Sequence, residues 1–171
     1  IDCMKQTLIL VCGLPGSGKS FFAKQFAEQN HIPHFNSDIV RKQLFPRLRT
    51  YSELEKQQVY DWLITQTEMS LKAGKSVIID ATFYKKNLRT PFYDIASVLN
   101  IPIKIIHIYA ADALIKERTS AVRMDSEADY SVYLKLKTAF EPIDEYHLVL
   151  QSTNNNIDFL LREADSFLKH A

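Results

Sequence analysis

Cysteine and long apolar runs are scarce in this sequence, and their scarcity excludes several protein classes. Only two cysteines occur, Cys3 and Cys12, so a disulfide framework is not expected and a reducing compartment fits. No apolar run approaches the roughly 18 residues of a membrane span, and the N-terminus lacks the charged-then-apolar layout of a signal peptide. The sequence therefore predicts a soluble, cytoplasmic protein with no membrane partner.

An excess of one charge is also missing. The chain has 21 Lys and Arg against 20 Asp and Glu, a formal charge of +1, and the two signs are spread along it. Long-range attraction to nucleic acid is therefore expected to be weak, although a local basic groove is compatible with these numbers. No repeat, low-complexity tract or linker divides the sequence, and 46% hydrophobic residues suffice for a substantial core. Residues 1–171 are expected to form one domain.

Short apolar segments alternate with helical patterns along the chain. The predicted strands are residues 6–12, 33–36, 76–79, 101–109 and 147–150. Helical patterns follow each of them, and Thr90 with Pro91 and Ser126 with Asp129 are interpreted as helix starts. Strands that alternate with helices predict an α/β fold, a three-layer α/β/α sandwich around a five-stranded, mostly parallel sheet.

Glycine is rare, and its distribution is informative. Three of the four glycines lie in the eight-residue segment GLPGSGKS, between the first predicted strand and the first predicted helix. This segment matches the phosphate-loop pattern GxxxxGK[ST] in full. It also has the strand before it and the helix after it that the pattern requires, whereas a glycine-rich turn that matched by chance would not need these flanking elements. Backbone N–H groups of such a loop surround a phosphate, Lys19 offsets phosphate charge, and the Ser20 hydroxyl can hold Mg²⁺. The predicted residues that bind ATP and Mg²⁺ are Gly13, Leu14, Pro15, Gly16, Ser17, Gly18, Lys19 and Ser20.

Two aspartates follow predicted strands. Asp38 comes shortly after the second strand and Asp80 ends the third. Because ligands of open α/β sheets bind at the carboxyl ends of the strands, both carboxylates are expected at the site. One could take the proton from an acceptor hydroxyl, and the other could support Mg²⁺ or its waters, which makes Ser20 and Asp80 the predicted metal ligands. Alternatively, Asp38 only begins a helix and Asp80 only caps the chain that leaves its strand.

Further segments accompany the phosphate loop in a characteristic order. These are SDIVR (37–41), GKSVIIDATF (74–83), Arg89 and ERTSAVR (117–123). With the loop, they resemble the P-loop kinases related to the kinase domain of 5′-polynucleotide kinase and to zeta-toxin-like kinases. The resemblance implies a P-loop NTPase, nucleotide-kinase-like fold with a helical lid at about residues 112–129.

The resemblance also implies roles for individual residues. Asp38 would be the general base, Arg41 would contact the acceptor, and Arg118 and Arg123 would belong to a mobile lid over the phosphates. With Lys19 these form the expected catalytic set. The two lid arginines are five residues apart, whereas about four is usual in polynucleotide kinases, so they cannot point the same way along one straight helix.

Several of these residues have alternative interpretations. Arg41 could instead be solvated or form an ion pair with Asp38, and Arg89 could make either a site contact or a surface salt bridge. His107 lies in an apolar strand, where a buried structural histidine is the more common case. The aromatic pairs Phe83–Tyr84 and Tyr130–Tyr133 could wall an acceptor pocket, but aromatics at these spacings more often pack.

The predicted function is ATP-dependent transfer of the γ-phosphoryl group to a hydroxyl acceptor. The acceptor is either a nucleic-acid 5′-OH or a small molecule, and the near-neutral charge slightly favours the small molecule. The alternative is an ATP-binding regulatory ATPase or switch, which needs a residue that positions water. Hydrolytic families commonly place a glutamate after the strand-end aspartate, whereas here Ala81 follows Asp80, so a kinase is favoured.

Overall fold

The computed structural model describes residues 5–120 and 129–170. The strands are β1 (Leu8–Cys12), β2 (His34–Asn36), β3 (Val77–Ala81), β4 (Ile103–Tyr109) and β5 (Leu148–Gln151). The helices are α1 (Lys19–Asn30), α2 (Ser37–Leu44), α3 (Glu53–Lys72), α4 (Lys86–Val98), α5 (Asp112–Ser120), α6 (Tyr130–Ala139) and α7 (Ile157–Lys169). None of the helices in these two ranges is long and apolar enough to cross a membrane.

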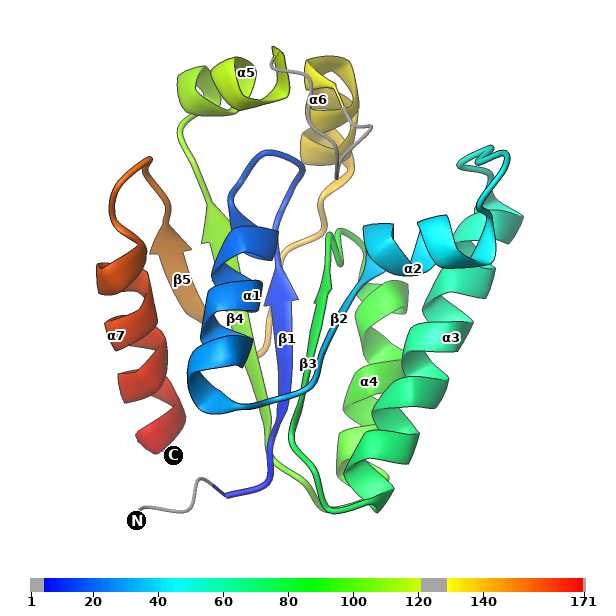
Figure 1. Cartoon of the computed structure of the whole chain (residues 1–171), viewed down its shortest axis with the longest axis vertical. Helices are drawn as coiled ribbons and strands as arrows, with labels where there is room; N and C mark the ends of the chain where they lie inside the picture. The colour runs from blue at the N-terminus through cyan, green and yellow to red at the C-terminus, as the bar shows by residue number, and fades with distance from the viewer. Residues whose placement is uncertain (1–4, 121–128, 171) are drawn as a thin grey trace.

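The five strands form one sheet in the order β2-β3-β1-β4-β5, and each pair of neighbours is parallel. The central strand β1 pairs through Cys12 with Ala81 of β3 and with His107 of β4. Since every strand points the same way, the carboxyl ends meet at one edge of the sheet, at the top of Figure 1. The sequence predicted a mostly parallel sheet, and the structure confirms it with all pairings parallel.

Helices cover both faces of the sheet. Leu8, Leu10 and Cys12 of β1 point to one face, where they pack with side chains of α2, α3 and α4. Ile9 and Val11 point to the other face and pack with α1 and α7. A strand buried on both faces needs apolar residues at successive positions, which explains the nearly continuous apolar runs of the sequence. The predicted three-layer sandwich is confirmed (Figure 1).

Two further helices, α5 and α6, stand above the carboxyl ends of the strands (Figure 1). Ile115 of α5 and Tyr133 of α6 are buried in a small apolar cluster of their own. The Tyr133 hydroxyl donates to Asp112 on α5 over 2.5 Å, and its ring stacks on Tyr130 at 5.6 Å between centroids. The Tyr130–Tyr133 pair therefore packs α6 against α5, and Arg123 of the expected lid lies outside the described residues.

The helix start expected at Thr90 is corrected by the structure, and the cap of a second helix is defined. Thr90 is not an N-cap, because α4 begins at Lys86 and contains Pro91 in its interior. The turn ahead of the proline carries the buried Arg89. The cap of α6 is Asp129, which accepts from the backbone N–H of Val132. The described helix begins at Tyr130, and the predicted start at Ser126 lies outside the described residues.

Candidate active site

The phosphate loop connects the end of β1 to the start of α1. Gly16 and Gly18 have φ of 80° and 88°, a left-handed conformation that glycine adopts without steric cost. A side chain at Gly13 would place its Cβ 2.5 Å from the carbonyl oxygen of Ile108. No side chain caps α1, whose N-cap residue is Gly18, so the first amides of the helix lie at the loop without a side-chain partner. A helix start of this kind favours the binding of an anion such as a phosphate.

Polar side chains from three elements meet beyond the loop. Ser20 donates to Oδ1 of Asp80 over 3.3 Å, and Asn36 donates to Oδ2 of Asp80 over 2.7 Å and to the Ser20 hydroxyl over 3.0 Å. Nε2 of His34 lies 3.1 Å from the same Oδ2. The structure thus brings together the two predicted metal ligands. Sequence reasoning missed Asn36 and His34, although both lie in the predicted second strand, whose carboxyl end was already assigned to the site.

The Asp80 carboxylate is fully buried, yet its surroundings favour the ionised form. Burial alone would raise the pKa of Asp80, but the hydrogen bond from His34, the charge of Lys19 and the amide of Asn36 hold it below its usual range. A carboxylate beside a serine hydroxyl is the hard oxygen donor set that Mg²⁺ prefers. Within the described ranges no group of three His, Cys, Asp or Glu side chains could hold a metal by itself.

Asn36 also determines where α2 begins. Its Oδ1 accepts from the backbone N–H groups of Asp38, over 2.9 Å, and Ile39, over 3.0 Å. Asn36 is therefore the N-cap, and Asp38 lies in the first helical turn, where a negative charge is stabilised by the helix dipole. Asp38 follows Asn36, the side chain that donates to both Ser20 and Asp80, by two residues, and its role as general base stays a prediction.

Arg118 reaches the phosphate loop from α5. Its Nη1 donates to the carbonyl of Gly16 over 2.9 Å and to the hydroxyl of Ser152 over 3.0 Å, and its Nη2 lies 3.4 Å from Oδ1 of Asn154. A cavity of about 370 Å³ opens beside these contacts. Its lining includes Gly18, Phe21, Arg118, Ser152, Asn154 and Ile157. A pocket of this size next to a phosphate loop is suited to the base of a bound nucleotide.

Arg41 pairs with a partner that the sequence did not suggest. Its Nη1 lies 3.0 Å from Oε1 of Glu55 on α3, and 12% of the Arg41 side chain is exposed. The expected alternative, an ion pair with Asp38, is therefore not what the structure contains. Glu55 follows Ser52 by three residues, which is the spacing of a helix-capping motif, and its burial could not be read from the sequence.

Arg89 is neither a surface ion pair nor exposed to the site. Only 1% of it is exposed, and it donates to the carbonyls of Phe83, over 2.7 Å, and Pro142, over 2.8 Å. Phe83 has a left-handed φ of 50°, so these bonds hold the turn after β3 in a strained conformation. Phe83 and Tyr84 are buried as well and belong to the packing of this turn.

His107 is a structural histidine. Its ring stacks on Phe140 at 5.2 Å between centroids. Burial, with a smaller effect of His147, lowers its pKa, so the neutral imidazole is favoured. His107 therefore needs no catalytic role, as the sequence suggested.

Comparison with known proteins identifies the family. The sequence profile described as AAA domain matches residues 8–143. The chain belongs to the AAA domain family. A relative from Acanthamoeba polyphaga mimivirus, named "Putative bifunctional polynucleotide phosphatase/kinase", is 35% identical over 78 residues. The match covers 46% of this chain and 14% of the mimivirus protein, so the chain spans only a small part of that relative's length.

Solved structures with the same fold include known kinases. A gluconokinase from Sinorhizobium meliloti superposes with a TM-score of 0.72 at 16% identity, covering 97% of this chain and 93% of the gluconokinase. A chain of the Pnkp1/Rnl/Hen1 RNA repair complex has a TM-score of 0.66 at 21% identity, covering 80% of this chain and 44% of that chain. At these identities the likeness establishes the fold. The expected resemblance to P-loop kinases is thereby confirmed at the level of the fold.

Proposed function

We propose that this AAA domain chain is an ATP-dependent phosphotransferase that moves the γ-phosphoryl group of ATP to a hydroxyl acceptor. The observation that carries the proposal is the double role of Asn36. Its amide nitrogen donates to Asp80 and Ser20, and its amide oxygen caps the helix that carries Asp38. One carboxylate thus stands on the metal side and a second at the start of the neighbouring helix, which is the arrangement that transfer to an acceptor requires.

Each group has a defined task in the proposed reaction. The backbone of the phosphate loop and Lys19 bind the phosphates, and Ser20 and Asp80 would hold Mg²⁺, which neutralises phosphate charge when bound. Asp38 accepts the proton of the acceptor hydroxyl. The new oxygen–phosphorus bond forms as the bond between the γ-phosphorus and the bridging oxygen breaks, and ADP leaves. Arg118 offsets charge beside the loop, and we assign the same task to Arg123.

The alternative function, a regulatory ATPase or switch, finds less support at the end of β3. The residue after Asp80 is Ala81, which is fully buried and has no group that could orient water. Hydrolysis needs such a group close to the γ-phosphate. The site therefore favours an acceptor hydroxyl over water.

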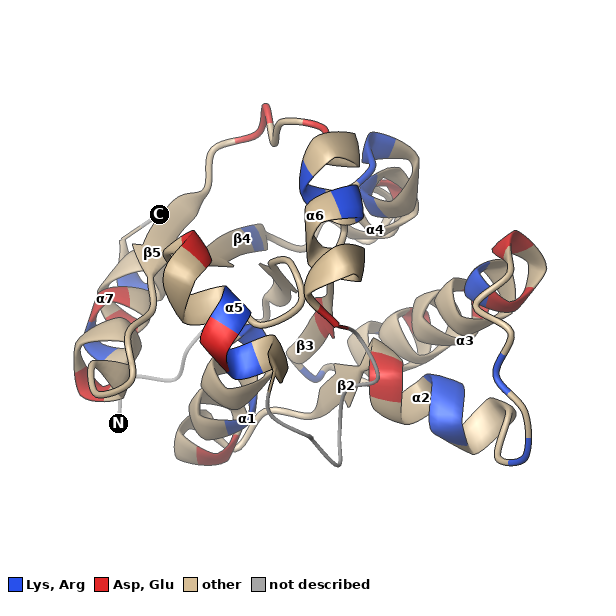
Figure 2. Cartoon of the chain, turned by 90° about the horizontal axis from the view of Figure 1, so that it is seen from above, with Lys and Arg blue, Asp and Glu red and all other residues tan. Residues whose placement is uncertain are grey.

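For the acceptor we propose a nucleic-acid 5′-hydroxyl. The mimivirus relative is named as a polynucleotide phosphatase/kinase. The whole chain is nearly neutral, which favoured a small acceptor, but its charges are unevenly placed. Residues 41–50, in α2 and the loop after it, contain no acidic residue and four cationic ones, Arg41, Lys42, Arg47 and Arg49, of which Arg41 pairs with Glu55 (Figure 2). A cationic corner next to the transfer site suits an acceptor with neighbouring phosphates.

Acceptor-dependent release of ADP tests the proposal. The protein receives ATP and Mg²⁺ alone, and then with 5′-hydroxyl oligonucleotides, nucleosides, sugars or aminoglycosides. We expect ADP to appear mainly with the oligonucleotides, together with their 5′-phosphorylated product. Release that is equal with and without every acceptor would favour an ATPase, and release with a sugar alone would replace the proposed acceptor.

Two variants test the assigned roles. Asp38→Asn should lower the transfer rate by about 10²- to 10⁴-fold, the usual contribution of a general base, and leave the ATP affinity nearly unchanged. Lys19→Ala should weaken both. Asp61→Asn removes an exposed carboxylate of α3 and serves as the matched control. Full turnover in Asp38→Asn would rule out its role as base.

A further inference from the structure

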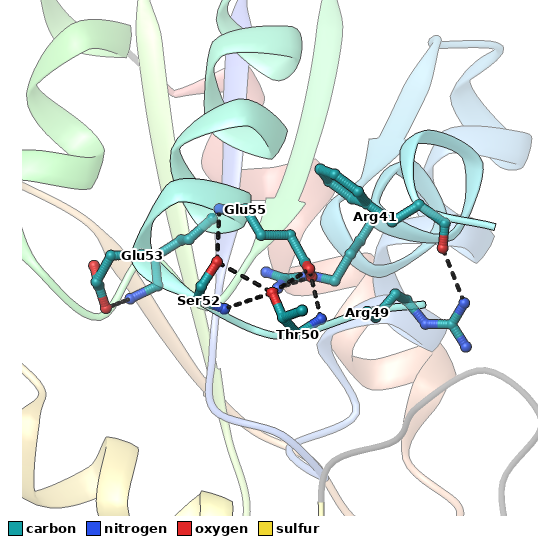
Figure 3. A network of polar contacts seen from close by, with 8 residues as sticks. Arg41, Arg49, Thr50, Ser52, Glu53 and Glu55 are labelled. Carbon is teal, nitrogen blue, oxygen red and sulfur yellow. Dashed lines mark hydrogen bonds and ion pairs between the residues drawn. The ribbon is translucent and has the colours of Figure 1, made fainter. Parts of the chain in front are cut away.

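The corner between α2 and α3 is built around a buried carboxylate. Only 4% of Glu55, in the first turn of α3, is exposed. Its Oε2 accepts from the backbone N–H of Thr50, over 2.6 Å, and from the Thr50 hydroxyl, over 2.9 Å, while its Oε1 faces Arg41 (Figure 3). Burial would raise the pKa of Glu55, but the bonds from Thr50 and Arg41 lower it below its usual range. Glu55 is therefore an ionised anchor for the corner.

Two side chains, Glu55 and Tyr51, contact the guanidinium of Arg41. Nη1 donates to Glu55, and the ring centroid of Tyr51 lies 4.7 Å from the guanidinium carbon, so the group is held by a carboxylate and by an aromatic ring. Tyr51 has a left-handed φ of 54°, which is strained for a residue with a side chain. The strained loop thus brings an aromatic ring against one particular arginine.

Stability alone does not account for this arrangement. A buried ion pair recovers little more than its cost of desolvation, and apolar residues of the same volume often stabilise a fold as well. Nε of Arg41 is buried and has no hydrogen-bond partner in the described part of the chain, so Glu55 leaves a donor of the guanidinium unsatisfied. Arg41 lies three residues after Asp38, on the same side of α2. The contacts therefore orient a cation beside the proposed base.

We infer that Glu55 is a positioning residue, which holds Arg41 in the orientation that binds the phosphate next to the acceptor hydroxyl. The inference rests on the proposed kinase function. Glu55 would touch neither ATP nor the acceptor, and would act through Arg41. Its loss should therefore weaken acceptor binding and leave ATP binding unchanged.

Glu55→Gln in the full chain tests the inference, because it keeps the volume and removes the charge that orients Arg41. The matched control is Glu53→Gln, which removes the same charge from the same helix turn at a side chain that is 86% exposed. The Kd of a labelled single-stranded oligonucleotide is measured by fluorescence anisotropy, and KM for ATP and for the oligonucleotide by ADP release. In Glu55→Gln we expect the oligonucleotide Kd and KM to rise about tenfold, the effect of one charge-assisted hydrogen bond, and the ATP KM to change less than twofold. Glu53→Gln should match the wild type.

A double variant distinguishes positioning from a general effect on the fold. If Glu55 acts through Arg41, the oligonucleotide Kd of Arg41→Ala with Glu55→Gln should equal that of Arg41→Ala alone. Additive losses, or a Glu55→Gln variant that melts earlier but binds the oligonucleotide like the wild type, would overturn the inference. If Glu55→Gln does not fold, Glu55→Asp is measured in its place, because it keeps the charge but is one methylene too short to reach Arg41 in the same geometry.

The outcomes also separate this inference from the proposed function. A wild-type chain that binds the oligonucleotide but transfers no phosphoryl group contradicts the kinase proposal, and Glu55 is then judged by the Kd values alone. A wild-type chain that transfers normally, with Glu55→Gln equal to it, contradicts only the role of Glu55. A wild-type chain that neither binds oligonucleotide nor transfers overturns both.

Discussion

Nδ2 of Asn36 lies 2.7 Å from Oδ2 of Asp80, while Oδ1 of the same amide accepts the backbone N–H of Asp38. A single side chain thus joins the buried carboxylate at the end of β3 to the first turn of α2. A displacement of the Asp80 carboxylate would be transmitted to the first turn of α2, because the amide of Asn36 is planar and is bonded at both its nitrogen and its oxygen. Asn36 is therefore the structural link between the proposed metal side and the proposed acceptor side of the site.

Replacement of this link should affect both sides. Asn36→Ala removes the cap of α2, which costs about 1 kcal/mol of stability, and leaves Asp80 with one donor fewer. We expect a lower melting temperature and a severalfold higher Mg²⁺ concentration for half-maximal phosphoryl transfer. Asn30→Ala, at the C-terminal end of α1, loses a bond to the Phe26 carbonyl and is the control. An unchanged Mg²⁺ requirement in Asn36→Ala would contradict the link.

Two glycines allow a matched test of the phosphate loop. Gly16 and Gly74 have nearly the same φ, 80° and 78°, so alanine at either should cost about 1–2 kcal/mol of stability from backbone strain. A Cβ at Gly16 would lie 3.1 Å from methyl groups of Ile115 and Thr119 on α5, whereas one at Gly74 would meet nothing within 4 Å. Gly16→Ala should therefore also weaken ATP binding, measured by calorimetry. Equal ATP affinities in the two variants would show that the contact between α5 and Gly16 does not affect ATP binding by the phosphate loop.

Arg118 should contribute to nucleotide affinity. Arg118→Ala removes the bonds to the Gly16 carbonyl and the Ser152 hydroxyl beside the proposed base pocket. We expect the Kd for ATP to rise about tenfold, as for the loss of a charged hydrogen bond, with little change in melting temperature. Arg162→Ala, which removes an exposed arginine of α7, should leave the Kd unchanged. A wild-type Kd in Arg118→Ala would remove Arg118 from the ATP site.

The surroundings of Asp80 predict an acid-sensitive fold. Its pKa is lowered in the folded chain, so the ionised carboxylate stabilises the fold above its unfolded pKa of about 3.9, and this stabilisation is lost as the pH falls through the folded value. The melting temperature of the wild type should therefore fall more steeply below about pH 4 than that of Asp80→Asn. Circular dichroism between pH 7 and pH 3 measures both. Parallel curves would show that Asp80 contributes no pH-linked stability.

Local patterns allowed some elements to be predicted and not others. The order of strands and helices followed from alternating apolar runs, and the phosphate loop followed from residues adjacent in sequence. The start of α4 was predicted wrongly. Thr90 followed by Pro91 is a common local signal for a helix start, but the helix begins at Lys86. The turn ahead of the proline carries Arg89, whose buried bonds reach the carbonyls of Phe83, six residues earlier, and Pro142, 53 residues later.

The same reasoning applies to the candidate site. The sequence placed Ser20 and Asp80 at the carboxyl ends of parallel strands, and the structure brings them into contact. It did not identify Asn36 as their partner, nor Glu55 as the partner of Arg41. Asparagine and glutamate at helix starts are common as caps, so their local context gave no sign of a second bond.

By itself, the sequence determined the parallel α/β fold, the phosphate loop and the two aspartates at strand ends, because apolar periodicity and glycine spacing act over a few neighbouring residues. Only the tertiary structure decided the strand order, the double bonding of Asn36, the pairing of Arg41 with Glu55 and the burial of Arg89. These contacts join residues far apart in the chain, or bind one side chain at both its ends. Their geometry depends on how the whole sheet and its helices pack.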